Sequence, residues 1–165
     1  MIDLRAEKEK AQKAKKAYHK LLDRLKRNPP RDLDQRVMEA DEAVFATLDC
    51  LDCANCCKSI SPIFTSKDVE RLASHEGMSP GRFMEVYLRI DEDQDMVLKS
   101  SPCPFLLPDN KCRVYEDRPK ACREYPHTGQ RKFHSHIEIT KKNILFCPAA
   151  FRVVEKLQAV YGLKE

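Results

Sequence analysis

The residues of this chain best able to do chemistry are four cysteines within eight positions, Cys50, Cys53, Cys56 and Cys57. Two residues between cysteines allow one tight turn to direct both sulfurs at a common point, as in metal-binding loops. Packing alone rarely explains four clustered thiols, although isolated cysteines are often plain core residues. The spacing therefore predicts that Cys50, Cys53 and Cys56 converge on one metal centre.

Cys57 needs a separate explanation, because it directly follows Cys56. Adjacent side chains on an extended backbone point in opposite directions. We therefore expect either a second metal centre for Cys57 or a structural role for it. The quartet is then not a self-contained site with four ligands.

Four further cysteines follow in short, loop-like settings that suit metal ligands. Proline flanks two of them, and the turn Asp109-Asn110 precedes a third. Eight thiolates can fill two four-coordinate zinc sites, one iron–sulfur cluster with one zinc, or fewer sites with cysteines left over. The predicted ligands of this second set are Cys103, Cys112, Cys122 and Cys147.

The start of the chain bears on the state of these thiols. Residues 1–8 are charged almost at once and lack the apolar core of a secretory signal, which predicts a reducing, cytoplasmic location. Structural disulfides are therefore disfavoured. No window approaches the roughly 18 consecutive apolar residues of a membrane span, so we expect a soluble protein without a membrane partner. Cysteine spacing in such a chain indicates metal or redox chemistry.

The elements that must position the thiols begin with a basic helix. Residues 1–31 carry eleven Lys or Arg against four acidic residues, and the rest of the chain carries 19 against 22. Apolar residues at seven-residue intervals predict a helix over residues 3–27, which Asn28-Pro29-Pro30 must end. A second apolar rhythm predicts a helix over residues 33–49, and the two helices are expected to form an antiparallel hairpin.

The basic face of this hairpin has two interpretations. It is either a surface that binds RNA or an acidic partner protein, or the ordinary solvated face of a helix that packs on its neighbour. The second is the more usual behaviour of lysine-rich helices. Binding that weakens with salt and is lost on truncating residues 1–31 would favour the first.

Two capped helices are predicted between the cysteine groups. Thr65-Ser66 begins the first helix, and Gly77 ends it. Ser79-Pro80 begins the second. We expect both to form a scaffold that covers the metal region and excludes water. The side chains predicted on the inner side of the second helix are Phe83, Val86, Tyr87 and Ile90.

From residue 96 the sequence changes to short apolar runs separated by Pro, Asp and Asn. Residues 96–98, 112–115 and 137–139 are predicted to be small strands or turns with poor cores, which a metal would hold together. A last helix is predicted over residues 149–161, ended by Gly162.

Together these elements predict a mainly α fold with a small, irregular region of strands and loops. Two domains are expected. The first is a basic N-terminal helical hairpin over residues 1–49. The second is a compact, metal-stabilised cysteine-cluster domain over residues 50–165, with the eight thiols as ligands.

Several cysteine motifs occur in a fixed order over about residues 50–150. They are Cys50-x2-Cys53-x2-Cys56-Cys57, Pro102-Cys103-Pro104-Phe105-Leu106, Cys112-x-Val114-Tyr115-x2-Arg118-Pro119-x2-Cys122, and Cys147-Pro148. In this order they resemble the YkgJ-type cysteine-cluster family, which is described as chelating zinc or iron. The resemblance implies a metal centre held by these cysteines, and it does not cover the N-terminal hairpin.

The chain departs from the family pattern at two places. Many members have glycine after the second cysteine, where this chain has Ala54, and Phe-Pro near the seventh, where it has Tyr125-Pro126. Both departures affect the local shape of a turn and leave the ligands intact.

The expected metal is zinc or iron, the latter either as an ion or in an iron–sulfur cluster. Three cysteines at two-residue spacing with a remote Cys-Pro are similar to the bacterial ferredoxin run, which favours iron. Cytosolic eight-cysteine domains are also often double zinc sites, which stabilise folding and perform no chemistry. Ligand type alone does not separate the two.

Three hypotheses of function follow. In the first, a structural or accessory metal centre acts through a protein partner of unknown identity. In the second, an iron–sulfur centre supports redox chemistry or methyl transfer with a partner, as implied by a similar cysteine cluster in flagellin lysine N-methylase. The four glycines form no nucleotide-binding turn, so no catalytic or cofactor-binding residue is assigned. In the third, the chain is an adaptor that binds RNA or acidic protein through its basic helix.

The polar residues near the last cysteines are expected to have supporting roles. His127, His134 and His136 are predicted to be surface residues, because eight thiolates already satisfy two centres. The spacing of His134 and His136 would place both imidazoles on one face of a strand. Arg118 and Arg123 are expected to donate to thiolates or backbone carbonyls rather than to bind an anion.

Overall fold

The computed structural model describes residues 2–162 and divides the chain into two compact units. The helical unit combines the chain up to Cys53 with the part from Pro126 onward, and the central unit spans Ala54–Tyr125. Within the described residues, helices dominate and the strands form one short pair. The predicted mainly α fold is therefore confirmed.

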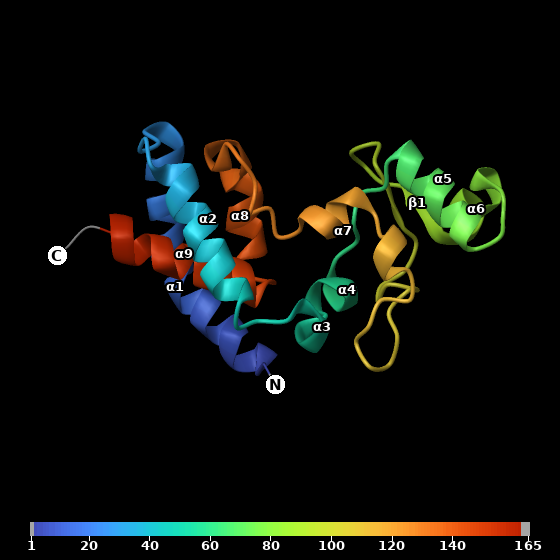
Figure 1. The fold of residues 1–165 in the computed structure, drawn as a ribbon, viewed down its shortest axis with the longest axis horizontal. Helices are drawn as coiled ribbons and strands as arrows, with labels where there is room; N and C mark the ends of the chain where they lie inside the picture. The colour runs from blue at the N-terminus through green and yellow to red at the C-terminus, as the bar shows by residue number, and fades with distance from the viewer. Residues whose placement is uncertain (1, 163–165) are drawn as a thin grey trace. The chain divides into compact units, whose positions relative to one another are not determined.

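Helices build the first unit (Figure 1). Its elements are α1 (Leu4–Arg27), α2 (Leu33–Phe45), α3 (Cys50–Cys53), the 3-10 turn η2 (Phe133–His136), α8 (Ile137–Asn143) and α9 (Pro148–Tyr161). The carboxylate of Asp3 begins α1, because it accepts hydrogen bonds from two amides of the first turn. Asn28 ends α1 as predicted. The next helix ends at Phe45 rather than at residue 49, since Thr47 donates twice to a carbonyl of its last turn.

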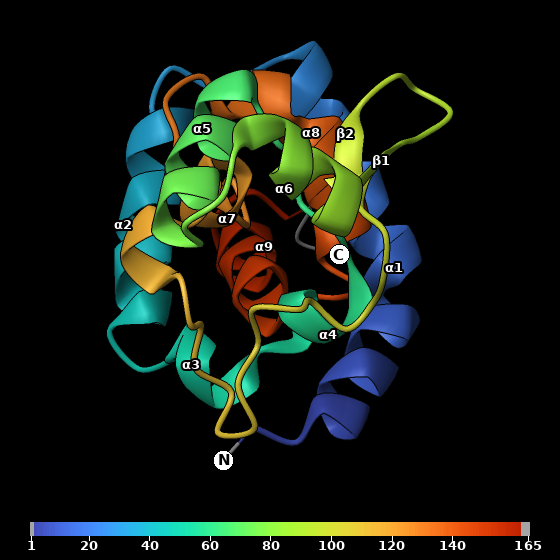
Figure 2. The same ribbon diagram turned by 90° about the vertical axis from the view of Figure 1, so that its right-hand side faces the viewer.

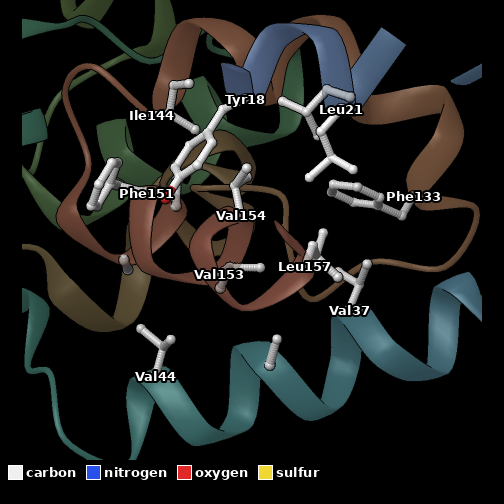
Figure 3. Close-up of a cluster of buried hydrophobic side chains, with 14 of the residues drawn as sticks. Tyr18, Leu21, Val37, Val44, Phe133, Ile144, Phe151, Val153, Val154 and Leu157 are labelled. Carbon is white, nitrogen blue, oxygen red and sulfur yellow. The ribbon is translucent and has the colours of Figure 1, made fainter. Parts of the chain in front are cut away.

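The core of the helical unit forms around α9. This helix packs against both α1 and α2, so the two helices of the predicted hairpin share one core with the C-terminal helix. Figure 3 shows Val153 and Leu157 among side chains from several other elements of the unit, including Leu21 and Val37. The compact units therefore cross the predicted domain boundary between residues 49 and 50.

Helix α8 corrects the strand or turn predicted over residues 137–139. Ile137, Thr140 and Asn143 are buried at three-residue intervals, whereas Ile139 is exposed. That spacing is helical, and the short Ile-Glu-Ile alternation did not distinguish it from a strand. The histidine pair that precedes it likewise lies in η2, not on a strand.

The central unit carries short helices and one strand pair. Its elements are α4 (Asn55–Ser59), α5 (Ser66–His75), α6 (Pro80–Tyr87), β1 (Leu88–Ile90), β2 (Met96–Leu98), the 3-10 turn η1 (Tyr115–Asp117) and α7 (Lys120–Glu124). Figure 2 shows the two antiparallel strands side by side, next to α6. The strand predicted over residues 96–98 is confirmed.

The predicted caps of α5 and α6 are confirmed. Thr65 and Asp68 form a reciprocal capping box, in which each side chain accepts a hydrogen bond from the backbone amide of the other. Gly77 follows the end of α5 with a φ of +68°, a conformation that favours glycine. Ser79 caps α6 and Pro80 occupies its first turn.

The inner side predicted for α6 is only partly right. Phe83 is fully buried, but Val86 is 39% exposed and Ile90 is 57% exposed. The helix ends at Tyr87 because the following residues pair with β2, and Leu88 lies opposite Leu98. The switch from helix to strand turns Ile90 away from the core.

A small aromatic core supports the cysteine loops of the central unit. Phe105 stacks on Phe83 with ring centroids 6.2 Å apart and an interplanar angle of 4°. Phe105 and Val114 are buried, and each follows a cysteine by two residues. Residues 112–115 contribute one bridge, between Cys112 and Leu106, followed by turns, in agreement with the predicted strand or turn. Core packing thus fixes the backbone beside two thiols.

Candidate metal centres

The eight cysteines divide between the two units. The helical unit contains Cys50, Cys53 and Cys147, which we call the three-thiol group. The central unit contains the other five. Four of these form the four-thiol group, Cys57, Cys103, Cys112 and Cys122.

Every pair of sulfurs in the four-thiol group is close enough for the two charges to interact. Burial, with a smaller contribution from the neighbouring sulfurs of the group, raises the pKa of Cys122 to about 12. Burial likewise raises the pKa of Cys103 to about 11. Four thiolates gathered in this way repel one another unless a cation compensates for their charge.

Backbone amides donate to these sulfurs. The Cys103 sulfur accepts from the amides of Phe105 and Leu106, and the Cys112 sulfur accepts from the amide of Val114. Such N–H···S bonds stabilise the thiolate form, which is the form that binds metal. The proline after Cys103 has no amide hydrogen, so the donors come from the second and third residues after the thiol.

Arg118 supports the same group through its charge. Its guanidinium lowers the pKa of both Cys112 and Cys122 against the stronger effect of burial. The side chain donates a hydrogen bond of 2.7 Å to the carbonyl of Tyr115, and its guanidinium carbon lies 3.8 Å from the centroid of the Tyr115 ring. Arg118 therefore favours thiolates while donating to a backbone carbonyl. Arg123 is exposed.

Cys56 and Cys57 lie on a helical turn, not on the extended backbone assumed from their sequence. The Cys56 thiol donates a hydrogen bond to the Cys57 sulfur, and a backbone amide and the charge of Lys58 also favour its thiolate. Together they lower the pKa of Cys57 to about 7, although burial acts to raise it. The carbonyl of Cys57 also accepts a hydrogen bond of 2.8 Å from the amide of Cys103. This bond joins the first cysteine motif to the second within the central unit.

Ala54 precedes that turn in a left-handed conformation, with a φ of +47°. This explains why glycine suits the position after the second cysteine, since a side chain costs about 1–2 kcal/mol there. Replacing Ala54 with glycine is expected to stabilise the protein by about 0.5–1 kcal/mol, because relief of strain exceeds the added freedom of the unfolded chain. Urea unfolding measures the change. Ala121→Gly in α7 is the matched control, with an expected loss of about 1 kcal/mol, and a loss at both positions would contradict the prediction.

Two charged residues of α5 hold the backbone that connects η1 to α7. Both oxygens of Asp68 accept hydrogen bonds, and one accepts from the amide of Lys120 at the start of α7 at 3.1 Å. Arg71 donates to the carbonyls of Asp117 and Arg118 at 3.1 and 2.9 Å. Cys122 lies on α7, so this pair positions one of the four thiols. The sequence predicted the capped start of α5 at Thr65-Ser66 and gave no signal for these longer contacts of Asp68 and Arg71.

The three-thiol group is supplied by α3 and by the cap of α9, which both belong to the helical unit. Cys147 caps α9, and its sulfur accepts from the amide of Ala150 at 3.4 Å. Burial, with a smaller contribution from the sulfurs of Cys50 and Cys53, raises the pKa of Cys147 to about 12. Cys53 is buried, whereas Cys50 is exposed. The group therefore reaches the surface at one thiol.

The three histidines near the last cysteines differ in exposure and conformation. His134 is exposed, as predicted for a surface residue, and His136 is half-buried. His127 adopts a φ of +68°, and its ring stacks on that of His136 with centroids 6.2 Å apart. All three belong to the helical unit.

The side chains as positioned in residues 2–162 form no ready-made group of three His, Cys, Asp or Glu ligands around one point. The donors themselves nevertheless suit zinc or iron, because cysteine thiolates are the usual ligands of both metals and most of these thiols are half-buried. In the same described range, no helix combines the length and the apolar character needed to cross a membrane.

Comparison with known proteins agrees with this chemistry. A family model described as "CxxCxxCC: Putative zinc- or iron-chelating domain" matches residues 49–148, a stretch that contains all eight cysteines. No curated protein and no solved structure matches the chain. Because the family model covers more than half of the sequence, the chain belongs to the CxxCxxCC family of zinc- or iron-chelating domains.

Proposed function

We propose that the chain binds zinc or iron at two separate centres, one in each compact unit. The observation that carries this proposal is the division of the thiols, since the four-thiol and three-thiol groups each interact internally and belong to different units. Backbone amides that donate to sulfurs in both groups support it. Two centres also give Cys57 a ligand role that is independent of its neighbour Cys56.

The centre proposed for the central unit is structural. Cys57, Cys103, Cys112 and Cys122 would complete a tetrahedral shell, which leaves no open position for a substrate. These residues come from four distant points of the chain, and the unit's core is small. A bound metal would neutralise the four thiolates and tie those points together. Asp68, Arg71 and Arg118 would then act by holding the ligands in place.

The centre proposed for the helical unit is accessory and acts with a partner protein. Three thiols leave one position of a tetrahedral metal for water or for a ligand from elsewhere. Iron–sulfur chemistry is the second candidate for this group, because Cys147-Pro148 resembles the Cys-Pro end of a ferredoxin run and Cys50 is exposed. When bound, such a cluster would supply electron transfer or support methyl transfer.

Metal analysis of single variants tests the two-centre proposal. Cys103→Ser is expected to remove the metal of the central unit alone, and Cys147→Ser that of the helical unit alone. Elemental analysis of anaerobically purified protein measures each loss, and visible absorption shows whether iron–sulfur bonds disappear with Cys147→Ser. Each variant is the control for the other. Loss of all metal in both variants would show a single shared centre and contradict the proposal.

A further inference from the structure

The outward face of α1 carries a concentration of positive charge with little compensation. The opposite face of this helix is buried in the core of the helical unit through residues such as Leu21, Leu22 and Leu25. Arg5, Lys10, Arg24 and Lys26 have acidic or carbonyl partners. Within the described residues, the exposed cations of α1 without such a partner are Lys8, Lys13, Lys15, Lys16, Lys20 and Arg27.

Part of this face is hollowed into a shallow depression of about 500 Å³, lined by Lys15, Lys16, Lys20 and Arg27. His19 lies in its wall and has a ring nitrogen 3.2 Å from the carbonyl of Lys141. Asp23 also lines the depression, but it forms an ion pair with Lys141. The depression therefore keeps its positive potential, and it offers several ammonium groups to one anion.

The order of these cations follows the helix. Residues four positions apart, such as Lys16 and Lys20, are separated by about 6 Å along the axis, at about 1.5 Å per residue. Lys13 and Arg27 extend the same face, so the row spans about 21 Å of α1. A row of point charges with this spacing matches a ligand that carries a regular series of negative charges.

We infer that this face of α1 binds the sugar–phosphate backbone of a nucleic acid without reading its sequence. Lysines and arginines alone are sufficient for such binding, because neutralised phosphates release counterions. A protein partner is less suited, since the exposed cations surround no aromatic anchor and Tyr18 is buried. An amphipathic membrane helix inserts its apolar face, and here that face is buried in the core.

Salt-dependent binding of metal-loaded full-length protein to a fluorescently labelled 20-nucleotide polyuridylate tests the inference. Fluorescence anisotropy between about 50 and 200 mM NaCl gives the slope of log affinity against log salt. Each phosphate contact contributes about 0.7 to that slope for a single strand. Lys15→Gln/Lys16→Gln/Lys20→Gln is therefore expected to reduce the slope by about 2 and to weaken binding at least tenfold at the lower salt.

The matched control is Lys67→Gln/Arg89→Gln/Lys111→Gln, which removes three exposed charges from the central unit. It is expected to keep the slope of the parent protein. Equal slopes for the two triple variants, or no binding of polyuridylate by the parent, would overturn the inference. Binding to polyglutamate or to vesicles of anionic lipid that survives competition by polyuridylate would also overturn it. These outcomes are independent of the metal centres, whose content is measured separately.

Discussion

Replacing Cys122 with serine is expected to release metal from the four-thiol group and to lower the melting temperature of the central unit by more than about 20 °C. Cys122 interacts with all three other sulfurs, and burial holds its pKa near 12 unless a metal compensates. Structural zinc contributes roughly 10 kcal/mol or more in small domains, and each kcal/mol moves the midpoint by about 4–8 °C. Circular dichroism on heating and elemental analysis measure both effects.

Two controls separate loss of metal from loss of packing. Wild-type protein treated with a strong chelator should melt like the Cys122→Ser variant, because both lack the metal. Cys147→Ser, in the helical unit, should leave amide-exchange protection of α5 unchanged. An unchanged melting temperature for Cys122→Ser, with its full metal content, would show that the four-thiol group is not a metal site.

Local signals in the sequence predicted much of the scaffold. These signals are the capping box at Thr65, the cap at Ser79 and the helix stop at Asn28. Each depends on residues within one turn of each other, so it can be predicted from sequence without knowing the tertiary fold. The last helix, predicted from residue 149, begins at Pro148. The cysteine motifs likewise identified the family, because their order along the chain is itself the signal.

The parts that sequence did not predict depend on distant residues. Helix α9 packs on both α1 and α2. The apolar stripes of α1 and α2 predict a buried face on each helix, but they do not identify the helix that packs against that face. The short run beginning at Ile137 fitted a strand as well as a helix, and burial at three-residue intervals decided between them. The prediction for Cys57 assumed an extended backbone, on which adjacent side chains point in opposite directions. The backbone there is helical, so that assumption was wrong.

The division of the thiols into two groups is also a product of the tertiary fold. Cys53 and Cys56 are separated by two residues, yet they belong to different compact units. The left-handed backbone of Ala54 lies at this change of unit. Spacing alone joined the first three cysteines of the quartet into one centre, and that expectation stays a prediction.

Beyond its capping box with Thr65, Asp68 supports the site by contacts that no sequence pattern indicated. It is 1% exposed, and each of its oxygens accepts two hydrogen bonds. One oxygen accepts from the amide and hydroxyl of Thr65, and the other accepts from Arg71 and the amide of Lys120. A carboxylate is the side chain that fits this arrangement, because it has acceptors on both sides and no donor.

Asp68→Asn is therefore expected to destabilise the metal-loaded protein by about 2–4 kcal/mol at pH 7. An amide group replaces one oxygen and faces two donors, so charge-assisted bonds are lost and buried donors remain unpaired. Urea unfolding measures this loss. Asp91→Asn is the matched control, with an expected change below about 1 kcal/mol, since a single oxygen of Asp91 accepts both loop amides and asparagine retains an oxygen.

The pH dependence of this difference tests the role of the charge. Burial favours the protonated acid, but the hydrogen bonds from Thr65, Arg71 and Lys120 outweigh it and lower the pKa of Asp68 below its usual value. A carboxyl with a depressed folded pKa contributes stability above its unfolded pKa of about 4, and that contribution is lost as pH falls through the folded pKa. The difference between wild type and Asp68→Asn should be constant from pH 7 to about 5 and shrink below 4. A difference that persists unchanged in acid would assign the effect of Asp68 to shape rather than to charge.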